Sequence, residues 1–444
     1  MTALLKGRSH GVRGLTVRAV LFRGSRDLIP LYALYALLFA DHGLSTAQIS
    51  LLLAMWSLTA FVLEVPSGAW ADTVSRRAML ILAALLMCTG FTVWTVAPGF
   101  LGFAVGFVVW GIAGALESGT FEALVYDELT AAGASSAYPR IMGYTRAAQE
   151  SAVVLAILAA APLYAWGGYA LVGWASVAVA GLHCLTALTL PSAPKAVSAA
   201  DIEALDDDAP PVPSLPGGVV AAGAPGIGGR EPRVFTRYRS MLRAGIGESM
   251  RVRHVRNGVL LGALIYGVTA YDEYFALLAQ TAGVSTAIVP LFVGVTVAGS
   301  LTGSLLAGRT ESMSGRTMAI ALVIGGVLFI GGALAAGVAA RHPSAVYPLA
   351  GAGFVAIGIA YGIVFNAEVV AEARLQDAIE GPARATVTSV SGLLSEVVAL
   401  AVFGFVALAT LWLSLSTTVA LLGVVMLFTA LVTPAWLPRR GGRV

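Results

Sequence analysis

Acidic side chains lie inside stretches of this sequence that are otherwise apolar, where a charge costs on the order of 2.5 to 3.5 kcal/mol in hydrocarbon. Such an acid normally faces a water-filled cavity or a partner, and loss of hydration favours its protonated form. Carboxyl groups in this setting can bind cations or carry protons. The acids from which we expect this chemistry are Asp27, Glu117, Glu150, Asp272, Glu273 and Glu396.

The depth of each acid in its apolar stretch separates these candidates. Counting about 1.5 Å per residue of helix, Glu150 and Glu396 lie nearest the middle, and we expect Glu150 to be the best-placed proton carrier. Glu117 and Glu122 are about 140° apart around a helix, so only one of them is expected to face a cavity. Acids nearer the ends are expected to make gate or packing contacts, and these are Glu64, Glu122, Glu368 and Glu372.

Aromatic side chains accompany the acids in the same stretches. Ring faces attract cations, as carboxylates do, although rings in membrane helices can also serve packing alone. Together the acids and the rings indicate a site for an amphipathic or cationic organic molecule. The rings that we expect at this site are Tyr32, Tyr35, Trp110 and Tyr271.

The composition indicates that a membrane positions these groups. Of the 444 residues, 58% are hydrophobic and 11% are charged, whereas soluble domains have about 25% charged residues. Stretches near the roughly 20 residues that span hydrocarbon predict an all-α polytopic membrane protein with twelve transmembrane helices. These helices are predicted at residues 19–40, 46–69, 78–97, 99–126, 141–165, 168–190, 257–281, 285–307, 317–340, 344–370, 385–410 and 412–436.

Basic residues set the predicted orientation, because loops rich in Lys and Arg stay in the cytosol. With both termini cytosolic, Arg341 alone among the 27 Lys and Arg residues falls in an outer loop. Arginines and apolar residues alternate at helical spacing between Arg230 and Met250, which predicts an amphipathic helix on the inner leaflet or merely a solvated basic linker. The predicted organisation is a cytosolic segment 1–18, a six-helix bundle 19–190, a cytosolic linker 191–253, a six-helix bundle 254–437 and a cytosolic tail 438–444.

The segment GAWADTVSRRAML, residues 68–80, is a charged turn between two predicted helices. It resembles the signature loop between helices 2 and 3 of the major facilitator superfamily. The matching residues are Gly68, Ala71, Asp72, Arg76, Arg77 and Leu80, whereas Trp70, Thr73 and Ser75 depart from the family pattern. The resemblance implies a conformational-switch loop in which Asp72 holds the first half to the positively polarised start of helix 11. Arg76 and Arg77 could instead serve orientation alone.

The resemblance also implies two six-helix bundles that rock around a central site. In that family every third helix supports the bundle from the lipid side, and the predicted helices 3, 6, 9 and 12 here contain no acid. A short repeat agrees with two related halves, because GLSTA at 43–47 and GVSTA at 283–287 each open an even-numbered helix.

On this basis we expect a secondary transporter of the cytoplasmic membrane that exports a small amphipathic or cationic organic molecule in exchange for protons. No paired Arg or Lys is expected at mid-membrane to bind an anionic nutrient. Helix 4 lacks the arginine of many family exporters, and the glycine-proline motif of helix 5 is reduced around Pro162. These departures leave open uptake or facilitated diffusion of a sugar or another metabolite. A transporter-like receptor or assembly subunit that moves nothing is the alternative of another class.

The sequence gives no indication of an enzyme. Lys6 and Lys195 are the only lysines and neither follows a phosphate-binding loop pattern, while His183 is the only histidine deep in a predicted helix. We therefore expect no metal and no cofactor beyond a proton gradient. The expected partners are a small-molecule substrate and the lipid bilayer, without nucleic acid, and we expect a monomer.

Overall fold

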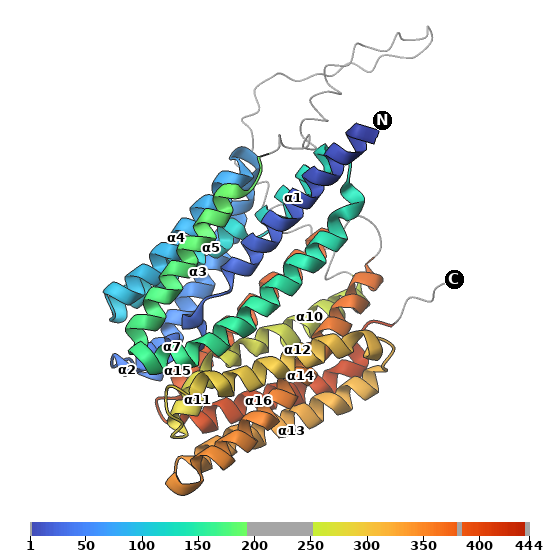
Figure 1. Ribbon diagram of the computed structural model, residues 1–444. Coiled ribbons are helices and arrows are strands. Elements are labelled where there is room, and N and C mark those ends of the chain that lie inside the picture. Colours follow the sequence, from blue (N-terminus) through green and yellow to red (C-terminus); the bar gives the residue numbers. More distant parts are fainter. Residues whose placement is uncertain (1, 193–251, 380–383, 440–444) are drawn as a thin grey trace, which may run out of the picture.

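The computed structural model describes residues 2–192, 252–379 and 384–439 (Figure 1). Side chains are described from Gly11 onward, except at 65, 68–69, 71–73, 384–386 and 389. The amphipathic helix predicted between Arg230 and Met250 and the end of the predicted tail lie outside the described residues. All regular secondary structure within the described ranges is helical.

The helices fall into two consecutive sets along the chain. The first helix group contains α1 Thr2–Arg26, η1 Pro30–Ala33, α2 Tyr35–Asp41, α3 Thr46–Thr73, α4 Arg76–Val96, α5 Phe100–Glu117, α6 Thr120–Ala131, η2 Ser135–Ala137 and α7 Tyr138–Thr189. The second helix group contains α10 Arg253–Gly267, η3 Val268–Tyr274, α11 Phe275–Thr281, α12 Val289–Thr310, α13 Gly315–Ala339, η4 Pro343–Ala345, α14 Val346–Ala378, α15 Arg384–Ala409 and α16 Leu415–Trp436.

Length and composition make this a multi-pass membrane protein. Nine helical stretches among the described residues are long and apolar enough to cross a membrane. One of them contains α7, whose 52 residues are divided by non-helical backbone at Gly167 and Gly168. The predicted boundary between 141–165 and 168–190 falls at this point.

The prediction of one continuous helix over residues 19–40 is wrong. The helix α1 already begins at Thr2 and ends at Arg26, and the chain then turns before η1 and α2. Pro30 has no backbone N–H, and Ile29 before it is extended, with φ −101° and ψ 106°. Both features exclude a regular α-helix at this point. The prediction of a continuous helix over 257–281 is likewise wrong, because residues 268–274 form the 3₁₀-helix η3.

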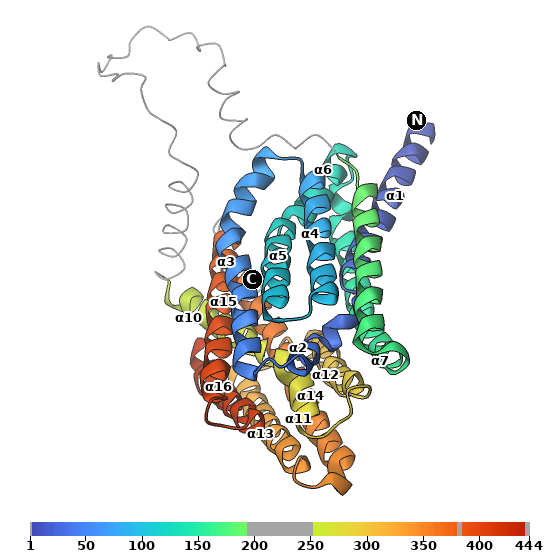
Figure 2. The ribbon, with the colours of Figure 1, turned by 90° about the vertical axis from the view of Figure 1, so that its left-hand side faces the viewer.

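The two helix groups lie side by side. In Figure 1 the first group, coloured blue to green, occupies the upper part of the view and the second group, yellow to red, the lower part, and Figure 2 shows the same separation from another side. Within the first group α4 packs on α5 and α7, and within the second α13 packs on α14 and α16. The groups meet where α3 packs on α15, α7 on α12, and α2 on α11.

The short repeat seen in the sequence is also a repeat of backbone conformation. Gly43 and Gly283, the first residues of GLSTA and GVSTA, both adopt the left-handed region, with φ of 86° and 96°. Glycine reaches this region without steric cost, so the chain can reverse direction at both places before the next helix begins. We call this side of the molecule the His42 end, after the exposed histidine beside Gly43, and the opposite side the Ser75 end.

Glycine residues permit close approach of neighbouring elements in both helix groups. A methyl group on Gly106 would overlap the Trp94 indole, and one on Gly362 would approach the carbonyl oxygen of Gly299 at 2.6 Å. Backbones in membrane helices pack most closely through such small residues. The crossing of α12 and α14 therefore depends on glycine on both sides.

We expect Gly303→Ala to destabilise the protein by about 1 to 3 kcal/mol, because its new methyl group would overlap the carbonyl oxygen of Gly362. The measurement is the thermal unfolding temperature in detergent. Gly351→Ala is the matched control on α14, since nothing lies within 4 Å of a methyl group there. Equal unfolding temperatures for the two variants would contradict the close packing of α12 on α14.

Candidate functional site

The helices that carry the central acids are interrupted at matching places. The 240-residue offset between GLSTA and GVSTA places the 3₁₀-helix η1, at 30–33, on residues 270–273 inside η3. In transporters with internal repeats, discontinuous helices at corresponding positions of the two halves form the central site. Tyr32, Tyr35, Asp272 and Glu273 all lie on or beside these interruptions.

Acids of the second helix group bind neutral hydroxyl donors. Tyr361 donates to Asp272 at 2.5 Å, and Ser57 donates to Glu396 at 2.6 Å. The Tyr35 hydroxyl donates to Glu273. None of the ion pairs among the described side chains includes these three acids. Their charge is therefore not neutralised by a described cation.

Three acids of the first helix group, Asp27, Glu117 and Glu122, are instead paired with arginines of α1. The Glu117 carboxylate is 2.8 Å from Arg23 and 2.7 Å from Arg26, and Asp27 is 2.9 Å from Arg26. Glu122 also pairs with Arg23. Asp27 and Glu117 are each 5% exposed, so the pairs are well shielded from solvent. The sequence analysis missed Arg23 and Arg26, although the adjacency of Arg26 and Asp27 was a visible signal.

The expectation that only one of Glu117 and Glu122 faces a cavity assumed one continuous helix through both residues, and that assumption is wrong. The helix α5 ends at Glu117 and α6 restarts at Thr120, with Gly119 in the left-handed region at φ 67°. This break removes the 100° per residue rotation on which the expectation rested. As a result, both carboxylates reach Arg23.

Stacked rings form an aromatic layer in the first helix group. The ring centroids of Tyr32 and Trp110 are 5.4 Å apart at 17°, and those of Trp56 and Trp110 are 5.0 Å apart at 23°. These three side chains are partly exposed, whereas Tyr35 is buried. Tyr271 is fully buried, with its ring 4.4 Å from that of Phe329, so it belongs to the core of the second group.

Glu150 has an ion-pair partner that the sequence analysis did not assign. Its carboxylate lies 2.8 Å from Arg146, one helical turn earlier on α7, and the two side chains are 35% and 71% exposed. Proton carriage by Glu150 stays a prediction, but its contacts are those of an exposed pair.

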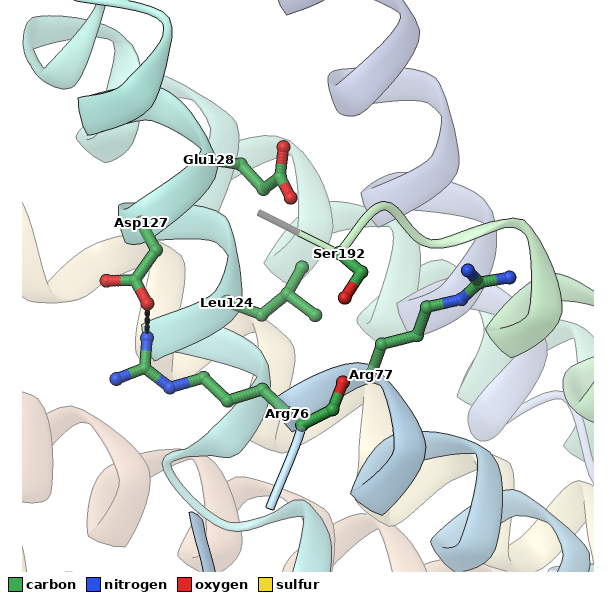
Figure 3. A pocket seen from close by; sticks show the side chains of 7 residues that line it. Arg76, Arg77, Leu124, Asp127, Glu128 and Ser192 are labelled. Atoms are coloured by element: carbon green, nitrogen blue, oxygen red, sulfur yellow. Dashed lines mark hydrogen bonds and ion pairs between the residues drawn. The ribbon is translucent and has the colours of Figure 1, made fainter. Parts of the chain in front are cut away.

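The described part of the signature loop connects helix ends within the first helix group. Figure 3 shows Arg76 beside Asp127, with which it forms an ion pair, and it also donates to the carbonyl oxygen of Ala123 at 2.9 Å. Arg77 donates to the carbonyl oxygen of Leu188 at 2.6 Å. These contacts tie the start of α4 to α6 and α7 around a cavity of about 200 Å³. The surroundings of Gly68 and the side chain of Asp72 are outside the described part of the structure. The predicted contact of Asp72 with helix 11 is therefore untested.

A second cavity of about 210 Å³ lies between α10, α14 and α15. Glu368 and Glu372, one turn apart on α14, line it together with Tyr266 and Ser395. Tyr266 is 51% exposed. The sequence analysis assigned gate or packing contacts to both acids, and their place on a cavity wall is compatible with a gate.

The hydrogen bonds that join described side chains of the two helix groups extend from the His42 end to the level of Ser57. They join Tyr35 to Glu273, Ser57 to Glu396, Ser50 to Tyr274 at 2.8 Å, and Asp41 to Gln280 at 2.9 Å. Among the described side chains no hydrogen bond joins the groups nearer the Ser75 end, where Glu150 and Glu372 are partly or fully exposed. The described contacts therefore close the His42 end.

Comparisons with known proteins agree with this architecture. Residues 19–391 match the family model described as Major Facilitator Superfamily. No curated protein sequence matches the chain.

Solved structures resemble the fold over almost its whole length. A D-xylose-proton symporter has 16% identity and a TM-score of 0.62, and covers 96% of this chain and 97% of its own. The POT family transporter PepTSo has 11% identity and a TM-score of 0.66, with 96% and 97% covered. The nucleoside transporter NupG has 12% identity and a TM-score of 0.62, with 97% and 100% covered. At these identities the likeness concerns the fold alone.

Proposed function

We propose, from the premise that this chain belongs to the Major Facilitator Superfamily of secondary transporters, that it exports a small amphipathic or cationic organic molecule in exchange for protons. The two helix groups would rock around a central site, so that the site opens alternately to each side of the membrane. Proton movement down its gradient would drive the export.

The observation that carries this proposal is the difference between the two sets of acids. Asp272, Glu273 and Glu396 meet hydroxyl groups, whereas Asp27 and Glu117 meet arginines. A carboxyl group without a cation beside it can exchange a proton or bind a substrate cation. The partly exposed rings of the aromatic layer support a cationic or amphipathic substrate, because ring faces attract cations.

Two arginines near these acids bear on the choice between a cationic and an anionic substrate. Arg23 and Arg26 lie in α1, near the start of the span predicted at 19–40, and both pair with Glu117. Glu117 contacts both guanidinium groups, so they are neutralised rather than free to bind an anionic nutrient. The expectation that no pair of Arg or Lys at mid-membrane binds an anionic nutrient stays a prediction, and it requires that Glu117 keep both guanidinium groups occupied.

The test of this function is transport by the purified protein in vesicles with imposed pH gradients. We expect accumulation of an amphipathic cation that collapses when the gradient is dissipated. The panel should also contain sugars, nucleosides and peptides, because the similar structures are those of a xylose symporter, a nucleoside transporter and a POT family transporter. Movement of a neutral metabolite alone would favour uptake or facilitated diffusion, and movement of none would favour a receptor or assembly subunit.

We further propose twelve membrane spans in two six-helix bundles, with both termini in the cytosol, in the cytoplasmic membrane. The nine apolar stretches supply ten of these spans, because α7 divides at Gly167 and Gly168. The interrupted rods α1–η1–α2 and α10–η3–α11 would supply the other two. The protein would act as a monomer.

Cysteine labelling checks this topology. In sealed cells we expect a membrane-impermeant thiol reagent to label cysteine placed at His42 or Pro98, which are exposed at the His42 end. Cysteine at Ser192, which is exposed at the Ser75 end, should react only after the membrane is permeabilised. Labelling of Ser192→Cys in intact cells would reverse the proposed orientation.

A further inference from the structure

We propose that Glu273 and Glu396 form a proton-dependent latch between the helix groups, which closes the His42 end when their carboxyl groups are protonated. The inference rests on the proposed proton coupling and names the groups that would link proton binding to the change of access. It also assigns Tyr35 and Ser57 as the hydroxyl partners that position these carboxyl groups.

The geometry that carries the proposal is a pair of hydrogen bonds, among the four that join described side chains across the bundle interface, in which the second helix group supplies the acid. Tyr35 on α2 donates to Glu273 on η3, and Ser57 on α3 donates to Glu396 on α15 at 2.6 Å. In both pairs the hydroxyl belongs to the first helix group and the acid to the second. Opening the His42 end requires that α2 leave α11 and that α3 leave α15, so both bonds must break.

No described arginine, lysine or histidine forms an ion pair with Glu273 or Glu396. Glu273 is faced by Tyr32 and Tyr35 from the first group and by Tyr361 from α14, with Asp272 and Tyr274 on its own element. Glu396 is faced by Glu64 from α3 and Tyr266 from α10, besides Ser57. The charged group that acts on Glu396 directly is Glu64, whereas the arginines Arg26 and Arg146 act on the neighbouring rings of Tyr32 and Tyr266.

This environment determines whether protonation of the two acids favours the closed or the open His42 end. Closing the interface withdraws each carboxyl group from water, and burying an unpaired charge costs more than one hydroxyl hydrogen bond returns. A protonated carboxyl carries no such cost and can still bond the same hydroxyl. Protonation therefore favours the closed His42 end, and ionisation favours its opening.

The proton balance follows from the same geometry. A proton from the outer water binds an oxygen of Glu273 or Glu396 while the His42 end is open. The neutral carboxyl then permits closure, and the proton leaves to the water at the Ser75 end. One proton is carried inward for each acid that completes this cycle, and no other reactant is consumed.

The test is the distance between spin labels at the His42 end as a function of pH. Labels at Ala97→Cys, after α4, and Ser344→Cys, in η4, are exposed positions of opposite helix groups and report opening in a chain whose Cys88 and Cys184 are replaced by alanine. For the otherwise native chain in lipid, we expect the closed population to grow as the pH falls from about 8 to about 5. Glu273→Gln, a permanently neutral substitute, should raise the closed-to-open ratio at high pH about tenfold and flatten the pH profile.

Two phenylalanine variants separate protonation from hydrogen bonding. Tyr35→Phe removes the hydroxyl donor to Glu273 but keeps the acid. It should therefore change the closed-to-open ratio, while the dependence of that ratio on pH remains. Tyr274→Phe removes the 2.8 Å contact with Ser50, which involves no acid, and is the matched control with an unchanged profile. Glu396→Gln, read with the same labels, provides the second neutral variant if Glu273→Gln does not fold.

Each outcome decides the proposal. A flattened profile in Glu273→Gln or Glu396→Gln supports the latch, whereas native pH profiles in the glutamine variants that fold overturn it. A native chain without any pH-dependent opening also overturns it. The labels report opening without substrate, so failure of the latch can be distinguished from failure of the vesicle assay to find an exported cation.

Discussion

Glu117→Gln is expected to lower the free energy of unfolding by about 3 to 5 kcal/mol, the usual cost of removing one partner from a buried ion pair. The Glu117 carboxylate accepts from both Arg23 and Arg26, and its side chain is 7% exposed. Glutamine has nearly the same shape but no charge, so Arg26 would keep only Asp27 as an acidic partner and Arg23 only Glu122. The measurement is the denaturant or thermal unfolding transition in detergent, followed by tryptophan fluorescence.

Glu122→Gln is the matched control for this prediction. It removes the other acidic partner of Arg23, but the Glu122 side chain is 40% exposed, so water can replace part of the lost interaction. We expect a loss of about 1 kcal/mol or less. Equal losses in the two variants would contradict the special place of Glu117 between the two arginines. A well-folded Glu117→Gln that no longer binds substrate would instead assign this residue to the substrate site.

The second large effect is expected in transport. Asp272→Asn should abolish accumulation of substrate against its gradient while sparing energy-independent counterflow, because the asparagine side chain cannot carry a proton. The hydroxyl of Tyr361, 2.5 Å from Asp272, can still bond the amide oxygen, so the local structure should remain. We expect the accumulation ratio to fall to about one, with counterflow reduced by no more than roughly tenfold, about 1.4 kcal/mol. Parallel vesicle assays of both processes check this.

Glu150→Gln is the competing variant in the same assay. The sequence analysis ranks Glu150 first as proton carrier because of its depth, whereas the structure pairs it with Arg146. If Glu150→Gln loses accumulation and Asp272→Asn retains it, the ranking by depth is right and coupling lies in the first helix group. Loss of counterflow as well as accumulation in Asp272→Asn would assign Asp272 to substrate binding.

Properties that depend on neighbouring residues could be predicted from the sequence. Apolar length and turn residues determined most helix positions, including the division near Gly167 and the repeated turns at Gly43 and Gly283. The signature loop at residues 68–80 led to the family that the family model also identifies. These features are local because each depends on hydrocarbon thickness or on the backbone preferences of a few adjacent residues.

The partners of the central acids were decided only by the tertiary structure. Glu117 meets Arg23 from 94 residues away, Tyr35 meets Glu273 from 238 residues away, and Ser57 meets Glu396 from 339 residues away. Depth along a helix does not report which face meets which neighbour, since helix breaks such as those before Pro30 and at Gly119 rotate everything that follows. A carboxyl group in a membrane is stabilised by the hydrogen-bond donors and cations that neighbouring helices place beside it. Packing brought arginines to Asp27 and Glu117, and hydroxyl groups to Asp272, Glu273 and Glu396.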